Sequence, residues 1–170
     1  MTKIKNLIFT FCFIILNFTY VNASEKVAFV DIDYIVQNSN VGKSALESIR
    51  KLDEKNINTL KNKTRELKDL EIEIQNKKNI ISSEAYESEV KLFKEKLNNY
   101  KNQKNSIIKN FNDFKKKELD KIFAEITPVI KNYMDKNSVE ILLDTKNIFM
   151  GNDNINLTED ILNEVNKSLN

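Results

Sequence analysis

The feature that most constrains the fold is residues 43–136, a stretch without glycine whose only proline is Pro128. Within it, apolar residues recur at alternating steps of four and three, the seven-residue pattern of a coiled-coil seam. The densest series, polar only at Lys104, is Tyr86, Val90, Phe93, Leu97, Tyr100, Lys104, Ile107, Phe111 and Phe114. A sparser series with steps of seven precedes it: Leu60, Leu67, Ile74 and Ile81. Two helices with one seam each predict a long antiparallel helical hairpin over residues 43–136.

The hairpin is predicted to turn near residues 76–83, where Asn79 and a pair of serines interrupt the pattern. Ser83 is a suitable N-cap for the returning helix, because a serine hydroxyl accepts hydrogen bonds from the free N–H groups of a first turn. Ile80 and Ile81 are predicted to lie at the tip. Two interpretations stay open for them: they close the two helix ends over each other, or they form an exposed contact patch.

The returning helix changes character before its end. After Phe114 the seam shifts, and a wider apolar face follows: Leu119, Ile122, Phe123, Ile126, Val129, Ile130 and Tyr133. A wider apolar stripe predicts that the helix has entered a core. Pro128 lies inside this face, where it either kinks one continuous helix or begins a new helix capped by Thr127.

The rest of the mature chain, 24–42 plus 137–170, predicts a base that is discontinuous in sequence. Apolar runs rich in β-branched residues predict three short strands, at residues 26–31, 139–144 and 147–150. The last two strands are close enough in sequence to pair as an antiparallel hairpin. Thr158 is predicted to cap a C-terminal helix. The elements between the first strand and the hairpin are predicted as a helical turn at 33–37 and a loop at 38–42.

The predicted fold class is therefore α+β, mostly α: a coiled-coil arm on a small β-containing base. A single core below about 70 residues rarely supplies more than a few kcal/mol without disulfides or a metal, and short strands leave unpaired edges. Oligomerisation solves both problems, so the base is predicted to join subunits. The residues expected to form this oligomerisation base are Val27, Phe29, Val30, Ile141, Leu142, Leu143, Ile148 and Phe149.

Residues 1–23 have the pattern of a secretory signal peptide. Two lysines precede an apolar core of residues 7–16, and a small-residue cleavage site ends at Ala23. The single cysteine, Cys12, lies inside this core. The mature chain is therefore expected to be exported, to begin at Ser24 and to contain no disulfide.

Composition argues against most catalytic chemistry. The chain has no histidine and no tryptophan, and only two glycines. Without His or Cys, the mature part offers no Ser–His or Cys–His nucleophile and no ordinary zinc site. Isolated glycines do not form a phosphate-binding loop. We therefore expect no enzyme activity, no catalytic residues, no cofactor and no metal.

The charge is divided between the two parts of the chain. Residues 43–136 carry 22 Lys and Arg against 16 Asp and Glu, a formal charge of +6, whereas the rest of the mature chain has a formal charge of −6. A basic arm predicts acidic polypeptides or anionic lipid surfaces as partners of an exported protein. Nucleic acid is not expected, since an exported protein rarely meets it.

The two ends of the mature chain carry a family resemblance. The residues that carry it are Val27-Ala-Phe-Val-Asp31, Tyr34-Ile-Val-Gln37, Val139-Glu-Ile-Leu-Leu-Asp144, Leu157-Thr-Glu-Asp-Ile-Leu162 and Val165. With the export signal and the charged hairpin between them, the chain resembles the Skp/OmpH family of periplasmic chaperones. The resemblance implies a homotrimer in which base strands from three subunits form one β-assembly. It also implies three arms that enclose a cavity for unfolded outer-membrane β-barrel proteins, without nucleotide.

The function expected on this resemblance is that of an ATP-independent periplasmic holdase that prevents aggregation of its clients. The expected client-binding residues are the arm lysines and the two tip isoleucines: Lys91, Lys94, Lys101, Lys104, Lys109, Lys115, Lys116, Lys117, Ile80 and Ile81. The alternative is a structural or adaptor coiled-coil protein of the cell envelope that binds a folded partner. Weak contact of the basic arm with an anionic membrane surface is a further possibility.

Overall fold

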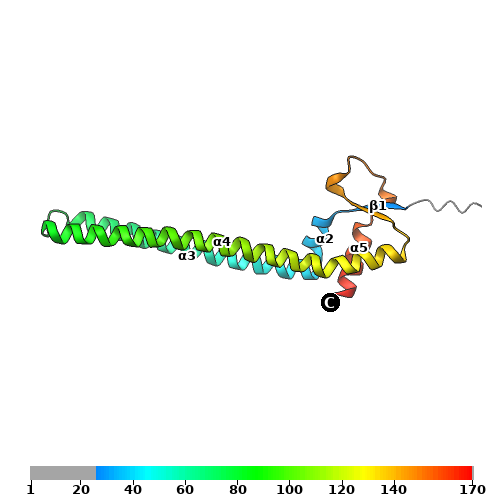
Figure 1. Ribbon diagram of the computed structural model, residues 1–170, viewed down its shortest axis with the longest axis horizontal. Helices are drawn as coiled ribbons and strands as arrows, with labels where there is room; N and C mark the ends of the chain where they lie inside the picture. Colours follow the sequence, from blue (N-terminus) through cyan, green and yellow to red (C-terminus); the bar gives the residue numbers. More distant parts are fainter. Residues whose placement is uncertain (1–25, 170) are drawn as a thin grey trace, which may run out of the picture.

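The computed structural model describes residues 26–169, and it consists of one long helical arm attached to a small base (Figure 1). The arm is formed by α3 (Asn40–Lys77) and α4 (Ser83–Lys136), which run side by side in opposite directions. At 1.5 Å per residue, α3 is about 57 Å long and α4 about 81 Å long. The predicted fold class and the predicted helical hairpin are confirmed. The predicted signal peptide, 1–23 with cleavage after Ala23, lies outside the described residues.

The root of α3 begins earlier than the sequence suggests. The predicted helical turn is α2 (Ile32–Asn38), and α3 follows it directly, so the loop predicted for residues 38–42 is wrong. Buried Ser39 caps α3, its hydroxyl accepting a hydrogen bond from the Gly42 N–H at 3.1 Å. A Cβ at Gly42 would stand 1.7 Å from the Val36 carbonyl oxygen. This glycine therefore permits close packing of α2 against α3, rather than freeing a loop.

The turn at the far end of the arm falls within the predicted residues 76–83. Lys78 is the C-cap of α3, and α4 begins at Ser83. The cap of α4 is Ser82, whose hydroxyl accepts from the Ala85 N–H at 3.3 Å, and not Ser83 as predicted. Both serines suit a cap, and only the backbone geometry of the turn decides between them.

Helix α4 is continuous through Pro128, so no new helix begins there. Thr127 does not act as a cap, because its hydroxyl donates to the Phe123 carbonyl of the same helix at 2.6 Å. Proline removes the hydrogen bond that would reach the carbonyl of Ala124. Ala124 and Pro128 are both exposed, so the carbonyl that loses its partner is on the solvent side of the helix, where a proline is tolerated.

Within residues 26–169 the base contains two strands and not the three predicted. β1 (Val27–Val30) pairs in parallel with β2 (Ile141–Asp144), in the register Val27↔Ile141 to Val30↔Asp144. The strand predicted at 147–150, and its antiparallel pairing with the preceding strand, are wrong. The chain leaves β2 through η1 (Thr145–Asn147), a tight turn that forms because the Asp144 carboxylate accepts from the Lys146 N–H at 3.1 Å.

Parallel pairing of β1 and β2 needs a long crossover, and α2, α3 and α4 supply it. On the other side of β1, the segment after η2 (Asp153–Ile155) approaches the strand, and the Leu157 N–H donates to the Phe29 carbonyl at 2.9 Å. The chain then enters α5 (Thr158–Ser168). Thr158 is the first residue of this helix and not its cap as predicted. Its hydroxyl accepts instead from the Asp31 N–H at 2.9 Å, which ties α5 to the end of β1.

The core lies where the arm enters the base. It is formed by apolar side chains from β1, α2, α3, α4 and α5: Val30, Ile35, Val36, Ala45, Ile122, Ile126, Ile161, Leu162 and Val165. Ile35, Ile126, Ile161 and Val165 are fully inaccessible to solvent. The widening of the apolar face after Phe114 therefore marks the entry of α4 into the core, as predicted.

Candidate functional site

The alignment of the two arm helices is given by two polar contacts between them. The hydroxyls of Thr64 and Tyr100 are 2.9 Å apart, and nearer the tip Lys77 Nζ lies 3.1 Å from Glu89 Oε1. In an antiparallel pair, each step along α3 away from the tip matches one step along α4. Residues 50–65 of α3 therefore lie beside residues 100–115 of α4.

The eight lysines predicted from the sequence all lie exposed on α4. Lys116 has a carboxylate partner, since its Nζ lies 2.9 Å from Asp120 Oδ2, and this contact raises the pKa of Lys116. The other seven have no ion-pair partner within residues 26–169: Lys91, Lys94, Lys101, Lys104, Lys109, Lys115 and Lys117. The positive charges of these side chains are therefore not neutralised by a contact within these residues.

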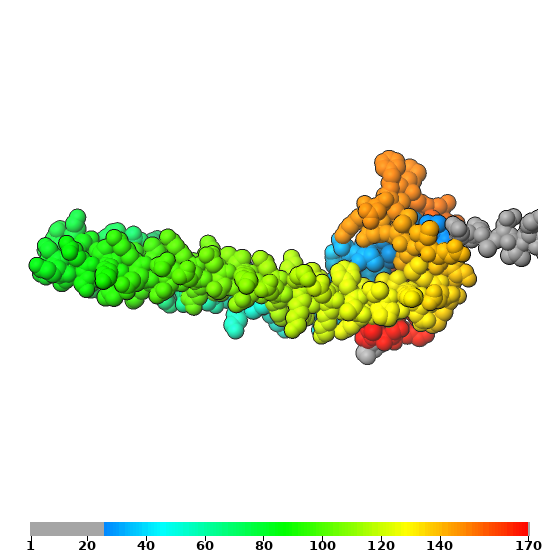
Figure 2. All heavy atoms as spheres, in the orientation of Figure 1, coloured from blue at the N-terminus to red at the C-terminus, as the bar shows by residue number. Residues whose placement is uncertain are grey.

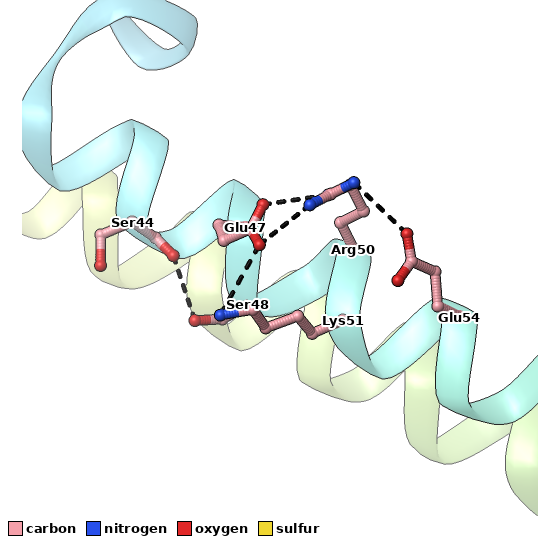
Figure 3. Close-up of polar contacts among 6 residues, drawn as sticks. All are labelled: Ser44, Glu47, Ser48, Arg50, Lys51 and Glu54. Carbon is pink, nitrogen blue, oxygen red and sulfur yellow. Dashed lines mark hydrogen bonds and ion pairs between the residues drawn. The ribbon is translucent and has the colours of Figure 1, made fainter.

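The sequence prediction missed the cations that α3 contributes at the same level of the arm. They are Arg50, Lys51, Lys55, Lys61, Lys63 and Arg65, all exposed except the half-buried Lys63. Figure 3 shows that Arg50 lies between Glu47 and Glu54, with its Nε 2.9 Å from Glu47 Oε2. Lys51 contacts Glu47 as well, at 3.6 Å. The sequence could have indicated these residues, because counting equal numbers of residues from the predicted tip along both helices places them beside the lysines of α4.

The tip exposes one of its two isoleucines. Ile80 is 78% exposed, whereas Ile81 is half-buried. Below them, Lys77 lies 2.8 Å from Glu73 and 3.1 Å from Glu89, which links the two helices. Ile80 therefore does not close the helix ends, and it remains a predicted contact residue.

Two arm carboxylates make the stability of the hairpin depend on pH. Arg50 lowers the pKa of Glu47, and Lys77 lowers the pKa of Glu73, both chiefly through hydrogen bonds. A carboxyl with a lowered pKa in the folded state adds stability above its unfolded pKa, and this contribution is lost as the pH falls through the folded pKa. We expect the melting temperature to fall slightly as the pH drops below the ordinary value of 4.5, since exposed pairs contribute little.

Circular dichroism melts at neutral pH and in acid measure this effect. The double variant E47Q/E73Q, which cannot titrate at these positions, should show a smaller drop in melting temperature than the native chain. An equal drop in both proteins would contradict the assignment to these two carboxylates.

The residues predicted to join subunits fall into two groups. Val30 is buried in the core of its own chain, and Phe29, Leu142 and Ile148 are half-buried. The more exposed group comprises Val27 at 37%, Ile141 at 44%, Leu143 at 40% and Phe149 at 101%. Side chains alternate between the two faces of a strand. Val27, Ile141 and Leu143 therefore share one apolar face of the sheet, opposite the face that covers the core.

The connection between β2 and α5 projects from the base, as Figure 2 shows in orange. Phe149 and Met150 lie in this connection, and Met150 is 81% exposed. Met150 was not among the predicted residues, although it ends the same predicted strand as Ile148 and Phe149. Within residues 26–169, β2 pairs only with β1, so its other edge is open.

Metal sites, membrane-spanning helices and surface grooves are the other features that could carry a function in the described part of the chain. Within residues 26–169, no three His, Cys, Asp or Glu side chains gather in a way that would hold a metal ion. In the same residues no helix has both the length and the apolarity to cross a membrane. A groove of about 440 Å³ at the root of the arm is lined by residues of α3 and α4, among them Ser44, Ser48 and Glu118, and by Leu169 at the end of α5.

Comparison with known proteins identifies one family. The family model described as Outer membrane protein (OmpH-like) matches residues 26–165. Among solved structures, a Caulobacter crescentus CB15 protein, provisionally described as an OmpH-like outer membrane chaperone, superposes with a TM-score of 0.77 at 18% sequence identity. The superposition covers 86% of this chain and 86% of that chain, and at this identity it shows a shared fold. No curated protein matches the chain.

Proposed function

We propose that this protein is a chaperone of the cell envelope, because the chain belongs to the family of OmpH-like outer membrane proteins. The model of that family matches nearly all of the described residues. It acts as an ATP-independent holdase in the periplasm, where it captures unfolded outer-membrane β-barrel proteins and prevents their aggregation. The family match carries this proposal. The description of the Caulobacter crescentus protein as an outer membrane chaperone supports it.

The shape of the arm supports a holdase over an adaptor that binds one folded partner. The arm has one seam and no second layer, and between residues 50 and 73 of α3 no side chain is buried. Its exposed lysines carry charge without a rigid hydrogen-bonding geometry, so they favour many weak contacts over one defined pocket. Such contacts suit an unfolded client, because they hold it without selecting a conformation.

The base supports assembly into the homotrimer that the family resemblance implies. The face formed by Val27, Ile141 and Leu143, together with exposed Phe149, leaves apolar surface in water in a single chain. Covering this surface stabilises an assembly by roughly 25 cal/mol per Å² of apolar area. Three subunits joined through their bases would place three arms around one cavity for the client.

Light scattering tests the proposal. A urea-unfolded outer-membrane β-barrel is diluted into buffer with the mature protein and without nucleotide. We expect scattering to be suppressed, with saturation near three subunits per client and weaker suppression at high salt, since salt screens the arm charges. Unchanged scattering at several-fold excess of the protein would refute the holdase and leave the adaptor coiled coil as the better explanation.

A further inference from the structure

Charge is distributed unevenly along the arm. The distal third, residues 66–100, carries six Lys and Arg against eight Asp and Glu. Two segments that lie side by side, residues 50–65 of α3 and 101–117 of α4, together carry twelve Lys and Arg and only three Asp and Glu. We call these two segments the basic belt. The formal charge is −2 in the distal third and +9 in the basic belt, so the positive charge of the arm is concentrated midway along its length.

Most cations of the basic belt have no ion-pair partner within residues 26–169. Arg50, Lys51 and Lys116 contact carboxylates. The other nine have no ion pair within residues 26–169: Lys55, Lys61, Lys63, Arg65, Lys101, Lys104, Lys109, Lys115 and Lys117. Like charges this close repel one another, and an anionic partner would relieve that repulsion. The belt is therefore suited to bind anionic groups from outside the chain.

Two exposed isoleucines lie in the middle of the belt. Ile57 on α3 is 55% exposed and Ile108 on α4 is 46% exposed. They occur at the same level of the arm, given the alignment set by Thr64 and Tyr100.

They also share a side of the arm. Residues seven apart lie on the same face of a coiled-coil helix. Ile57 and Thr64 each directly follow a half-buried seam position of α3, at residues 56 and 63, and Ile108 directly follows the half-buried seam residue Ile107 of α4. In an antiparallel pair, the positions that follow these seam residues in the two helices flank the seam on one side. Ile57 and Ile108 are therefore both exposed on the side where the Thr64 and Tyr100 hydroxyls meet, and we call them the apolar pair.

We propose that the basic belt is the capture site of the arm, and that it binds acidic segments of unfolded polypeptide that also carry apolar side chains. This inference rests on the proposed holdase function and names the part of the arm that performs it. A polypeptide of this kind satisfies both the unpaired cations and the isoleucine pair. A phosphate polymer or a lipid headgroup surface would satisfy the cations alone. The acidic distal third and the acidic base repel the same segments, which keeps the client midway along the arm.

This proposal separates residues that the sequence analysis grouped together. Lys101, Lys104, Lys109, Lys115, Lys116 and Lys117 belong to the basic belt, whereas Lys91 and Lys94 lie in the distal third among carboxylates. Two charge-reversal variants compare the regions at equal total charge. The belt variant is K101E/K104E/K109E/K117E, and the distal variant is K78E/K91E/K94E/K96E. All eight of these lysines are exposed, so both variants should fold, which circular dichroism checks.

The apolar pair has its own matched control. The variant I57Q/I108Q removes the pair inside the belt, and I72Q/L92Q removes exposed apolar side chains of the distal third. Ile72 is 47% exposed and Leu92 55% exposed, so the two variants lose similar surface.

The experiment measures the affinity of each full-length mature protein for fluorescent unstructured peptides by anisotropy at low salt. One peptide carries Asp and Leu, a second has Ser in place of Leu, and a third has Lys in place of Asp. We expect the native protein to prefer the first peptide. The belt variant should bind it about tenfold more weakly, with the difference shrinking as salt rises. The I57Q/I108Q variant should lose preference for the first peptide over the second, while both distal variants bind like the native protein.

Equal losses in the belt and distal variants would overturn the proposal, because only total charge would then matter. It is also wrong if belt reversal abolishes binding to vesicles of anionic phospholipid and leaves peptide binding unchanged. Failure of the holdase itself looks different. In that case the native protein binds the acidic peptide through the belt but does not suppress scattering of an unfolded β-barrel.

Discussion

Replacing Ile126 with alanine is expected to lower the free energy of unfolding by about 3 kcal/mol. Ile126 has no solvent-accessible surface and packs in the cluster with Ile35, Ile161 and Val165, so its truncation leaves a cavity that these neighbours share. Because the hydrophobic core is small, this loss of free energy is a large fraction of the total stability. We therefore expect the base to unfold at much lower denaturant concentration than in the native protein.

Urea titration followed by circular dichroism measures the effect. The matched control is I108A, the same substitution on the same helix at a side chain that is 46% exposed. This control should change the free energy of unfolding by less than about 1 kcal/mol, because little buried surface is lost. Similar losses in the two variants would contradict the placement of the core at the root of the arm.

If the chain is the trimeric holdase proposed above, the double variant I141D/L143D is expected to yield folded monomers and to lose holdase activity. Both side chains are about two-fifths exposed in the single chain, so aspartate there remains hydrated and the monomer keeps its fold. In an assembly that covers this face, the same carboxylates would be buried without partners, at a cost of several kcal/mol each. On the proposed mechanism, capture then fails because a single arm leaves no cavity between subunits.

Analytical ultracentrifugation gives the mass of each species, and circular dichroism confirms that the variant is folded. The control I72D/L92D places two aspartates on comparably exposed apolar positions of the arm, and it should assemble like the native protein. If I141D/L143D still sediments as a trimer, the apolar sheet face is not the subunit interface.

The sequence was most informative where the determining pattern is local. The heptad seam from Tyr86 to Phe114 predicts the returning helix, and the widening of its apolar face predicts where that helix meets the core at Ile122 and Ile126. Periodicity over a few turns is enough for such predictions, because neighbouring turns of one helix share a face. The fold class followed from the seam together with the short apolar runs of the base, and the family resemblance followed from residues at the two ends of the mature chain.

The error in strand pairing arose because distant segments compete for the same partner. Residues 139–144 and 147–150 are close in sequence and predicted a hairpin, yet β2 pairs with β1 from the other end of the chain. The Asp144 carboxylate closes the η1 turn, which directs the following residues away from the sheet. Gly42 was interpreted as a loop residue, because the Val36 carbonyl that requires a glycine there lies on a different helix.

The sequence by itself determined that this chain forms a long basic helical hairpin on a small β-containing base, since helix periodicity and composition are properties of adjacent residues. Only the tertiary structure decided which strands pair, which face of the sheet stays uncovered and which cations of α3 lie beside those of α4. These features depend on the alignment of segments far apart along the chain. The physical reason is that side-chain packing and hydrogen bonds between such segments select one alignment among many that the local patterns allow equally.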